Sequence, residues 1–427
     1  MDKEDAGDVK KKWWKCFSRR KIHPELSQEA IIGNGSIMQN TFAPIEKKIL
    51  IIAGEASGDR HAADLVRELK ACDPQLQFSG IGGDAMRQEG VQLLYHISQL
   101  AFLGLTEVIK HLPFIRKVTK TVQSELKNGP GAVILVDYPG FNLRVARIAR
   151  EIGVPVVYYI SPQLWAWGEK RVEKIRRYVD LMLVIFQFEK TFYEKHGITA
   201  HFVGHPLVEQ LRIGKSEAEF RRQNSIPEDL PILALLPGSR EMEVRNLLPV
   251  MVQAAGELRK AVRCVAVIGR ASQLPQSLYD EYIPAGSDIR LVNSQTPLLM
   301  RYAYAAMVAS GTATLETGYL QTPMVVLYSV SPLTYWLGRM LVKIDTIALA
   351  NIVMGKKVVP ELIQKDISVE KVRAAVERFF SDPAYYRSVK EELKRIPALL
   401  GAEGASRRAA ERIVAFLQSL GSGGSEK

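Results

Sequence analysis

Two short loops in the second half of the sequence carry residue types that bind phosphate and ribose. In the first, Ser310, Gly311 and Thr312 follow an apolar segment at residues 306–309 and open a helical pattern. The first backbone N–H groups of a helix are unpaired and carry a partial positive charge, so such a loop can hold a phosphate. Glu316 lies four residues beyond Thr312, on the same helix face, where a carboxylate can accept hydrogen bonds from the two hydroxyls of a ribose.

The second loop adds a cation to this pattern. Gly238, Ser239 and Arg240 follow the apolar segment at residues 232–236. Turns rich in Ser, Gly and Thr also cap helices without binding anything, and for either loop alone that alternative stays open. The two loops together, with their arginine and their carboxylate, favour a clamp for a nucleoside diphosphate.

The first half of the chain offers a candidate general base. Asp137 ends the fully apolar segment at residues 132–136 and precedes Pro139 and Gly140. A carboxylate at the end of a buried strand is poorly solvated, which raises its pKa and its basicity. That environment suits removal of a proton from an attacking hydroxyl. The structural alternative is that Asp137 caps the following helix or holds the Pro139-Gly140 turn.

Another loop, with Glu55, Ser57 and Gly58, follows the apolar segment at residues 49–53. Gly58 allows a ligand to approach the backbone closely, and Glu55 can orient a sugar hydroxyl or merely brace the loop. The spacing is not that of a dinucleotide-binding GxGxxG turn.

Two further features stay open between binding and packing. Trp165 and Trp167 can stack on a sugar, cover an acyl chain or pack in the core. His205, after an apparent strand at residues 201–203, can donate to a phosphate or to the backbone, although a lone histidine is more often structural.

The elements that position these loops alternate between short apolar strands and helices. Such alternation predicts parallel sheets covered by helices on both faces, with ligands outside the carboxyl ends of the strands. The fold class is therefore α/β, with two doubly wound domains facing each other across a cleft. The predicted strands are residues 49–53, 132–136, 154–159 and 181–185 in the first domain, and residues 232–236, 264–268, 289–292, 306–309 and 324–327 in the second.

Composition narrows the class of protein. The chain has 427 residues, of which 47% are hydrophobic and 24% charged, and this is enough for two cores in a soluble protein. The net charge of +11 favours an anionic partner, such as a phosphorylated substrate or an anionic membrane surface. Three scattered cysteines indicate a reducing compartment rather than a zinc or disulfide framework. No apolar run is long enough to span a bilayer and no secretory signal is evident, so we expect a cytoplasmic protein.

One segment, residues 99–115, is unusually rich in large apolar side chains and also contains charges. It is either deep core or a face that enters lipid. Its candidate contact residues are Phe102, Leu103, Leu105, Val108, Ile109 and Leu112.

Taken in order, the motifs resemble one family, the lipid-A-disaccharide synthases, from about Lys47 to at least Leu362. Each motif alone is moderately specific, whereas the ordered set is highly specific. The motifs are Gly54 to Asp59; Asp137 with Pro139, Phe141 and Asn142; Ser161-Pro162 with Trp165 to Trp167; Gly204 to Pro206; Pro237 to Arg240 with Glu243; Ser310 to Ala313 with Glu316; and Asn351 after Tyr335-Trp336 and Leu341 to Lys343.

The resemblance implies an inverting glycosyltransferase of the GT-B type that needs no metal or other cofactor. It would join UDP-2,3-diacylglucosamine to 2,3-diacylglucosamine 1-phosphate (lipid X), giving the β-1,6-linked lipid A disaccharide 1-phosphate and UDP. Asp137 and Asn351 match catalytic positions. Gly238, Ser239, Arg240, Ser310, Gly311, Thr312 and Glu316 match the nucleotide-sugar site, and Glu55, Ser57, Gly58 and His205 the acceptor side.

The implied domains are a basic extension at residues 1–46, an acceptor domain at 47–210, a UDP-sugar domain at 211–385, and C-terminal helices with a flexible tail at 386–427 that pack back on the first domain. Acylated substrates favour the lipid-contacting reading of residues 99–115 and peripheral association with the anionic cytoplasmic face of the inner membrane. Ala350 stands before Asn351 where the family usually has proline.

Three other functions remain as alternatives. The first is a UDP-sugar 2-epimerase of the same fold, and the second is a nonenzymatic membrane-surface binder. Nucleic-acid binding is the weakest, because the basic residues are scattered and no recognised module appears. Acyl-chain length, oligomeric state and the role of residues 1–46 are not encoded in any pattern of the sequence.

Overall fold

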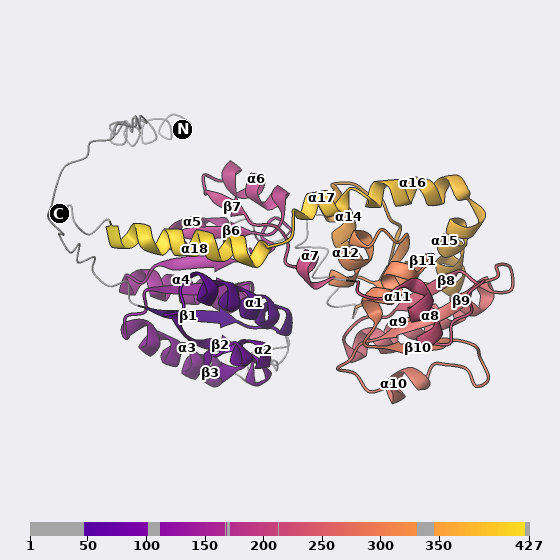
Figure 1. Cartoon of the computed structure of the whole chain (residues 1–427), viewed down its shortest axis with the longest axis horizontal. Helices are drawn as coiled ribbons and strands as arrows, with labels where there is room; N and C mark the ends of the chain where they lie inside the picture. Colours follow the sequence, from indigo (N-terminus) through magenta and orange to yellow (C-terminus); the bar gives the residue numbers. More distant parts are fainter. Residues whose placement is uncertain are drawn as a thin grey trace, which may run out of the picture. The chain divides into compact units, whose positions relative to one another are not determined.

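The computed structural model describes residues 47–100, 112–166, 168, 171–211, 213–330 and 346–422. Two parallel sheets organise this part of the chain (Figure 1). The first has the strand order β3-β2-β1-β4-β5-β6-β7. Its strands are β1 (Lys48–Ala53), β2 (Gln77–Gly82), β3 (Gln92–His96), β4 (Ala132–Val136), β5 (Val156–Tyr159), β6 (Leu181–Val184) and β7 (Ala200–Phe202).

Helices cover both faces of this sheet, which explains the unbroken apolar runs of its central strands. All residues of β4, β5 and β6 are buried, as are the last five of β1. The helices are α1 (Ala56–Cys72), α2 (Asp84–Gln88), α3 (Leu112–Lys127), α4 (Pro139–Ile152), α5 (Val172–Tyr178) and α6 (Gln187–Lys195), with a 3₁₀ turn at Ile97–Gln99.

The second sheet has the order β10-β9-β8-β11-β12-β13. Its strands are β8 (Ile232–Leu236), β9 (Val265–Arg270), β10 (Arg290–Asn293), β11 (Ala305–Ala309), β12 (Met324–Tyr328) and β13 (Glu361–Ile363). The remaining helices are α7 (Leu207–Gln210), α8 (Glu217–Gln223), α9 (Glu241–Leu258), α10 (Ser277–Asp280), α11 (Thr296–Tyr302), α12 (Thr312–Tyr319), α14 (Leu349–Met354), α15 (Val369–Ser381), α16 (Pro383–Leu393), α17 (Ile396–Leu400) and α18 (Ala405–Ser422), with a 3₁₀ turn at Gln364–Asp366.

Both sheets have the Rossmann strand order, which confirms the predicted fold class. In such a sheet the strand order reverses at one point, and ligands bind outside the carboxyl ends of the two strands that flank it. The flanking strands are β1 and β4 in the first sheet and β8 and β11 in the second. The four loops that follow these strands are the ones that carry Glu55, Asp137, Arg240 and Ser310.

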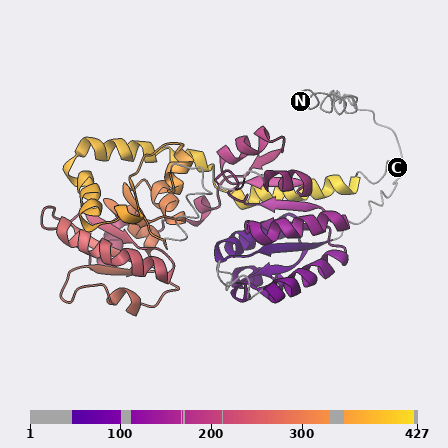
Figure 2. The ribbon, with the colours of Figure 1, turned by 180° about the vertical axis from the view of Figure 1, so that it is seen from behind.

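The last helix returns to the first sheet, as predicted. Helix α18 packs along α1 and reaches β6, whereas α15 contacts strands of the second sheet and α17 contacts α14 (Figures 1 and 2). The chain therefore crosses back after Leu400, beyond residue 386 where the predicted C-terminal segment starts. The division of residues among domains stays a prediction.

Candidate active site

Asp137 lies at the carboxyl end of β4, in a backbone turn held by hydrogen bonds. Asp137 and Tyr138 both have φ of 46°, a left-handed conformation that non-glycine residues rarely adopt. The Asn142 side-chain amide donates to the carbonyl oxygens of Val136 at 3.1 Å and Asp137 at 2.8 Å. The Tyr158 hydroxyl also donates to the Asp137 carbonyl, at 2.6 Å. These buried contacts stabilise a strained turn of the kind that clusters at active sites.

The carboxylate of Asp137 has the environment expected of a base. Burial, and after it the nearby Glu55 carboxylate, raise its pKa to about 6 against the opposing effect of a hydrogen bond from the Tyr138 backbone N–H. Helix α4 begins after Tyr138, whose side chain makes no cap hydrogen bond. At neutral pH the group is mostly ionised and still a stronger base than an ordinary aspartate.

The loop after β1 fits closely against this turn. A Cβ on Gly54 would lie 2.2 Å from the Tyr138 ring, so glycine lets the ring cover the backbone there. A Cβ on Gly58 would lie 3.5 Å from that of Ala53, an ordinary packing contact between α1 and β1. Glu55 is exposed and Ser57 is partly exposed, which leaves both able to reach a ligand.

In the second sheet, the loop after β8 is braced by Glu243. Gly238 adopts a φ of +113°, and the Glu243 carboxylate accepts hydrogen bonds from the backbone N–H groups of Ser239 at 3.0 Å and Arg240 at 3.2 Å. The Arg240 guanidinium lies 3.3 Å from the same carboxylate and its side chain is 78% exposed. An exposed arginine on a fixed turn can exchange this weak surface pair for a phosphate.

The loop after β11 leaves space at the start of α12. The Ser310 backbone N–H donates to Leu327 at 2.8 Å, and its hydroxyl donates to the Ile347 carbonyl at 3.3 Å. Gly311 and Thr312 are exposed, and a Cβ on Gly311 would meet no heavy atom within 4 Å. Helix α12 has no side-chain cap, so its first N–H groups remain available to a ligand.

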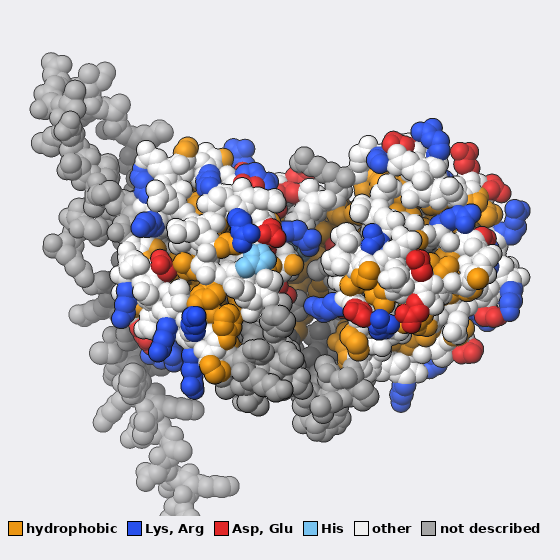
Figure 3. All heavy atoms as spheres, turned by 90° about the horizontal axis from the view of Figure 1, so that it is seen from below, with side chains coloured by type: hydrophobic (Ala, Val, Ile, Leu, Met, Phe, Trp, Pro, Cys, Tyr) orange, Lys and Arg blue, Asp and Glu red, His pale blue; other side chains and the backbone are white. Residues whose placement is uncertain are grey.

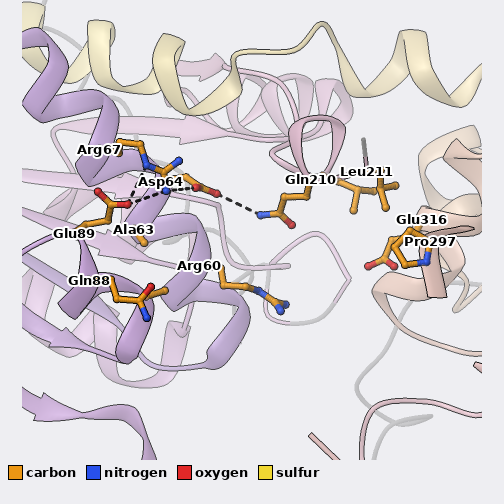
Figure 4. A pocket seen from close by; sticks show the side chains of 12 residues that line it. Arg60, Ala63, Asp64, Arg67, Gln88, Glu89, Gln210, Leu211, Pro297 and Glu316 are labelled. Carbon is orange, nitrogen blue, oxygen red and sulfur yellow. Dashed lines mark hydrogen bonds and ion pairs between the residues drawn. The ribbon is translucent and has the colours of Figure 1, made fainter. Parts of the chain in front are cut away.

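Glu316 lines a pocket of about 430 Å³ (Figure 4). The other lining residues include members of helices α1 and α2, which cover the first sheet, and Pro297 of α11, which packs on the second. Burial raises the pKa of Glu316, and the Arg60 guanidinium acts against that rise. Figure 4 shows Arg60 directed away from the paired Arg67, Asp64 and Glu89 side chains. Arg60 was not singled out in the sequence, because one exposed arginine on a helix carries no motif.

His205 is buried among backbone and aromatic partners, an environment that fits the structural alternative better than donation to a phosphate. Its Nδ1 accepts the backbone N–H of Leu207 at 3.0 Å, and its own backbone N–H donates to Leu400 at 2.8 Å. Burial, with His61 nearby, lowers the pKa of His205 to about 3, and the ring packs on Phe186 at 5.0 Å. A neutral, buried imidazole at this junction fixes the chain rather than supplying positive charge to a phosphate.

Asn351 is also placed differently from the catalytic expectation. It is fully buried, and its carbonyl oxygen accepts the N–H groups of Val358 at 2.7 Å and Val359 at 2.9 Å. Its amide donates to the Val359 carbonyl at 2.9 Å and to Glu361 at 2.8 Å. With every group engaged, Asn351 has no free atom for substrate and instead orders the segment beside Ser310.

Glu361 supports the segment beside Ser310, and sequence reasoning did not single it out. Its carboxylate accepts hydrogen bonds from the Thr346 hydroxyl and from the backbone N–H groups of Ile347 and Ala348. The segment it fixes provides the carbonyl to which Ser310 donates.

Ala350 lies in the first turn of α14, where backbone N–H groups need no helical partner, so alanine and proline are both compatible with this geometry.

Several predicted contacts fall outside the described residues. These are the apolar side chains of residues 101–111, Trp167, and the stretch 331–345 with its tyrosine and tryptophan. Leu112 opens α3.

No helix in the described part of the chain is long and apolar enough to cross a bilayer. Among the same residues, no three His, Cys, Asp or Glu side chains gather as metal ligands would.

Solved structures share this architecture. UDP-GlcNAc 2-epimerase from Neisseria meningitidis, solved with UDP-GlcNAc, superposes with a TM-score of 0.58 at 13% identity, covering 86% of this chain and 100% of that one. A calicheamicin glycosyltransferase has a TM-score of 0.58 at 17% identity, covering 87% and 98%. At these identities the likeness shows the fold alone. Two Rossmann sheets with open loops at both switch points define the GT-B class.

The family follows from sequence. A family model described as lipid-A-disaccharide synthetase matches residues 49–411. The chain belongs to the lipid-A-disaccharide synthase family, and it is a glycosyltransferase that transfers a hexose. Its relative from Geobacter sulfurreducens is 40% identical over 373 residues, covering 87% of this chain and 97% of the relative. The relative from Syntrophus aciditrophicus is 42% identical over 370 residues, covering 85% and 96%. The epimerase alternative therefore has support from fold only, and the nonenzymatic alternative is wrong.

Proposed function

We propose that this chain condenses UDP-2,3-diacylglucosamine with 2,3-diacylglucosamine 1-phosphate, forming the β-1,6-linked lipid A disaccharide 1-phosphate and UDP. The observation that carries the proposal is the placement of the family's motif residues at both switch points. A poorly solvated carboxylate follows β4, and an exposed arginine and an open helix start follow β8 and β11.

The proposed reaction is a single displacement with inversion. Asp137 accepts the proton of the acceptor 6-hydroxyl while that oxygen attacks the anomeric carbon of the donor. The bond from the anomeric carbon to the diphosphate breaks with its electron pair, and UDP leaves. A base with a pKa of about 6 is ionised at neutral pH, yet it holds the proton more tightly than an ordinary aspartate does.

Donor binding is assigned to the second sheet. The Arg240 guanidinium and the first N–H groups of α12 would offset the negative charge that develops on the diphosphate. Gly238, Ser239, Ser310, Gly311 and Thr312 would line the phosphate side, and Glu316 would accept hydrogen bonds from the ribose. The exposure of Arg240, Gly311 and Thr312 supports this assignment.

Acceptor binding is assigned to the loop after β1 and its neighbours. Glu55, Ser57 and Gly58 belong to the loop that contacts the Asp137 turn through Gly54 and Tyr138, and the electrostatic effect of Glu55 on Asp137 supports this assignment. Asp59, in the first turn of α1, ties this helix to the start of α2, because its carboxylate accepts the N–H groups of Gly83 at 2.6 Å and Met86 at 3.1 Å.

Peripheral binding to an anionic membrane surface completes the proposal. The acylated substrates, the net charge of +11 and the apolar composition of residues 99–115 support it. On the face drawn in Figure 3, basic side chains are scattered over both halves among acidic ones rather than gathered in one patch. That distribution leaves the apolar segment as the leading candidate for lipid contact.

The decisive experiment incubates the full chain with both acylated sugars and measures disaccharide and UDP together. Equal amounts of both products are expected. UDP release without disaccharide, or turnover of UDP-GlcNAc to an epimer, would contradict the proposed reaction.

Membrane contact is tested separately by flotation with vesicles that contain anionic lipid. Replacing both Leu103 and Val108 with Asp is expected to reduce binding strongly, with the melting temperature unchanged. Unfolding of the double variant would instead identify the segment as core.

A further inference from the structure

Glu189, a buried carboxylate on α6, is used by none of the steps above. Its side chain is 1% exposed. One carboxylate oxygen accepts hydrogen bonds from the Ser161 hydroxyl at 2.9 Å and the Trp165 indole N–H at 3.2 Å, and the other accepts the backbone N–H of Phe186 at 3.2 Å. The Tyr193 hydroxyl adds a long contact to Ser161 at 3.4 Å.

Burying such a carboxylate costs free energy that a folded protein could avoid. A buried carboxylate loses its hydration, and a hydroxyl, an indole and one amide compensate only in part. Its described partners include no Lys, Arg or His, and burial raises the pKa of Glu189 to about 7. Apolar side chains of similar size would pack the same space at lower cost. This cost indicates that the geometry imposed by Glu189 serves the site.

That geometry joins the loops after β5 and β6, and β5 is the neighbour of the strand that ends at Asp137. Ser161 and Trp165 follow β5, and Phe186 follows β6. Strand β5 pairs with β4, and the Asp137 backbone N–H donates to the Tyr159 carbonyl at 3.2 Å. Glu189 therefore ties the loop after β5 to the loop after β6, at the edge of the sheet where the candidate base lies.

Trp165 is the side chain most restricted by these contacts. Its indole N–H is held by Glu189, and its ring meets the edge of Phe188 at 5.0 Å with an interplanar angle of 89°. Phe188 in turn stacks on Phe186 at 5.3 Å. The indole stays partly exposed, so one part of a fixed aromatic surface faces out of the core. Aromatic faces of this kind pack well against sugar rings and alkyl chains.

We propose that Glu189 is a positioning residue for the acceptor, which fixes the Trp165 indole as a rigid wall beside Asp137 against which the acyl-glucosamine packs. This inference rests on the proposed function, because it takes the acceptor to lie beside Asp137. It extends that function by separating acceptor recognition on α6 and the loop after β5 from donor recognition on the second sheet.

The test measures KM for donor and acceptor separately in the full chain, after disaccharide formation by the unaltered protein is established. Failure of that first step would remove the proposed function; the steps that follow address Glu189 alone. Glu189→Gln keeps the shape of the side chain but loses one acceptor oxygen. Trp165→Phe replaces the indole by a smaller aromatic ring that has no N–H donor. Each is expected to raise the acceptor KM about tenfold or more, with the donor KM changed less than about twofold.

The matched control is Glu194→Gln, since Glu194 lies on the same helix but is exposed and pairs with Lys190 at 3.8 Å. Its two KM values are expected to equal those of the unaltered protein. The double variant of Glu189 and Trp165 is expected to lose little more than either single variant, because both act through one contact.

Equal changes in donor and acceptor KM, or unchanged KM values in folded variants, would overturn the proposal. If Glu189→Gln does not fold, Trp165→Phe decides the question alone, because it leaves the carboxylate's other two hydrogen bonds in place. An unchanged acceptor KM in that variant would reject the role.

Discussion

At the scale of single residues, Asp137 carries the sharpest prediction. Asp137→Asn keeps the shape of the side chain but cannot accept the proton, so we expect kcat to fall about 10²- to 10⁴-fold. The substrate KM values should change little, because the amide occupies the same space. Turnover within about threefold of the unaltered enzyme would remove Asp137 from this role.

The pH dependence of the rate follows from the same residue. Its pKa, raised to about 6 by burial, means that the carboxylate becomes protonated as the pH falls through 6. We therefore expect kcat/KM to be level above about pH 7 and to fall about tenfold per pH unit well below 6. A profile that stays level down to pH 5 would show that the base is another group.

Arg240 is expected to act on the donor. Arg240→Ala removes a guanidinium that is 78% exposed and pairs at the surface with Glu243, so the fold should be retained. We predict a rise in donor KM of about tenfold or more from loss of a charge-assisted contact, with the acceptor KM unchanged. Arg240→Lys should recover only part of the affinity, since a lysine cannot make a bidentate contact. An unchanged donor KM would contradict the assignment.

Residue types and spacing predicted the loops of the site better than the roles within them. Asp137 and the loop of Ser310 lie where the pattern placed them, because an apolar strand followed by a turn fixes the carboxyl edge of a sheet. His205 and Asn351 were assigned roles that their burial does not support. Whether a polar side chain faces a ligand or the backbone depends on contacts such as that from Glu361, which lies ten residues beyond Asn351.

At the scale of elements, the unbroken apolar strands were predicted, whereas β2, β3 and β13 were not. Strands β1, β4, β8 and β11 are unbroken apolar runs because helices cover both sheet faces. Strand β2 escaped notice because it contains glycines, which are common in turns. Gly80 is required there by packing: a Cβ would lie 1.7 Å from the Ile51 carbonyl oxygen. Strand β13 has only three residues, all of them partly exposed, and carries almost no pattern.

The segment that supports the loop after β11 yields an element-scale prediction. Asn351→Ala removes four hydrogen bonds of a buried amide and leaves the N–H groups of Val358 and Val359 without this partner. We expect a loss of unfolding free energy of about 3 kcal/mol, measured with urea, and a higher donor KM because the Ser310 loop loses its support. A stable variant with normal KM but greatly reduced kcat would restore a direct catalytic role.

At the scale of the whole molecule, two chain segments connect the halves. One follows β7 and the other joins α17 to α18. They meet directly, since the His205 N–H donates to the Leu400 carbonyl at 2.8 Å. Arg408 ties them further through hydrogen bonds to the carbonyls of Val203 at 2.9 Å, Ala402 at 2.7 Å and Glu403 at 2.6 Å. Gly204 has a φ of +88°, and a Cβ there would lie 2.5 Å from this guanidinium, so the position favours glycine.

This crossing sets how the acceptor and donor loops are held relative to one another, and Arg408→Lys tests it. A lysine can reach one or two of the three carbonyls, so we expect a loss of unfolding free energy of about 2 kcal/mol. The KM values for donor and acceptor should rise together, because Arg408 lies on the connection between the halves and in neither of the binding loops assigned above. Arg407→Lys is the matched control, since Arg407 is exposed and forms a surface ion pair with Glu411 at 3.1 Å. The unfolding free energy of this variant should differ from that of the unaltered protein by less than about 0.5 kcal/mol. Equal urea midpoints for the two variants would show that the Arg408 contacts do not stabilise the connection between the halves.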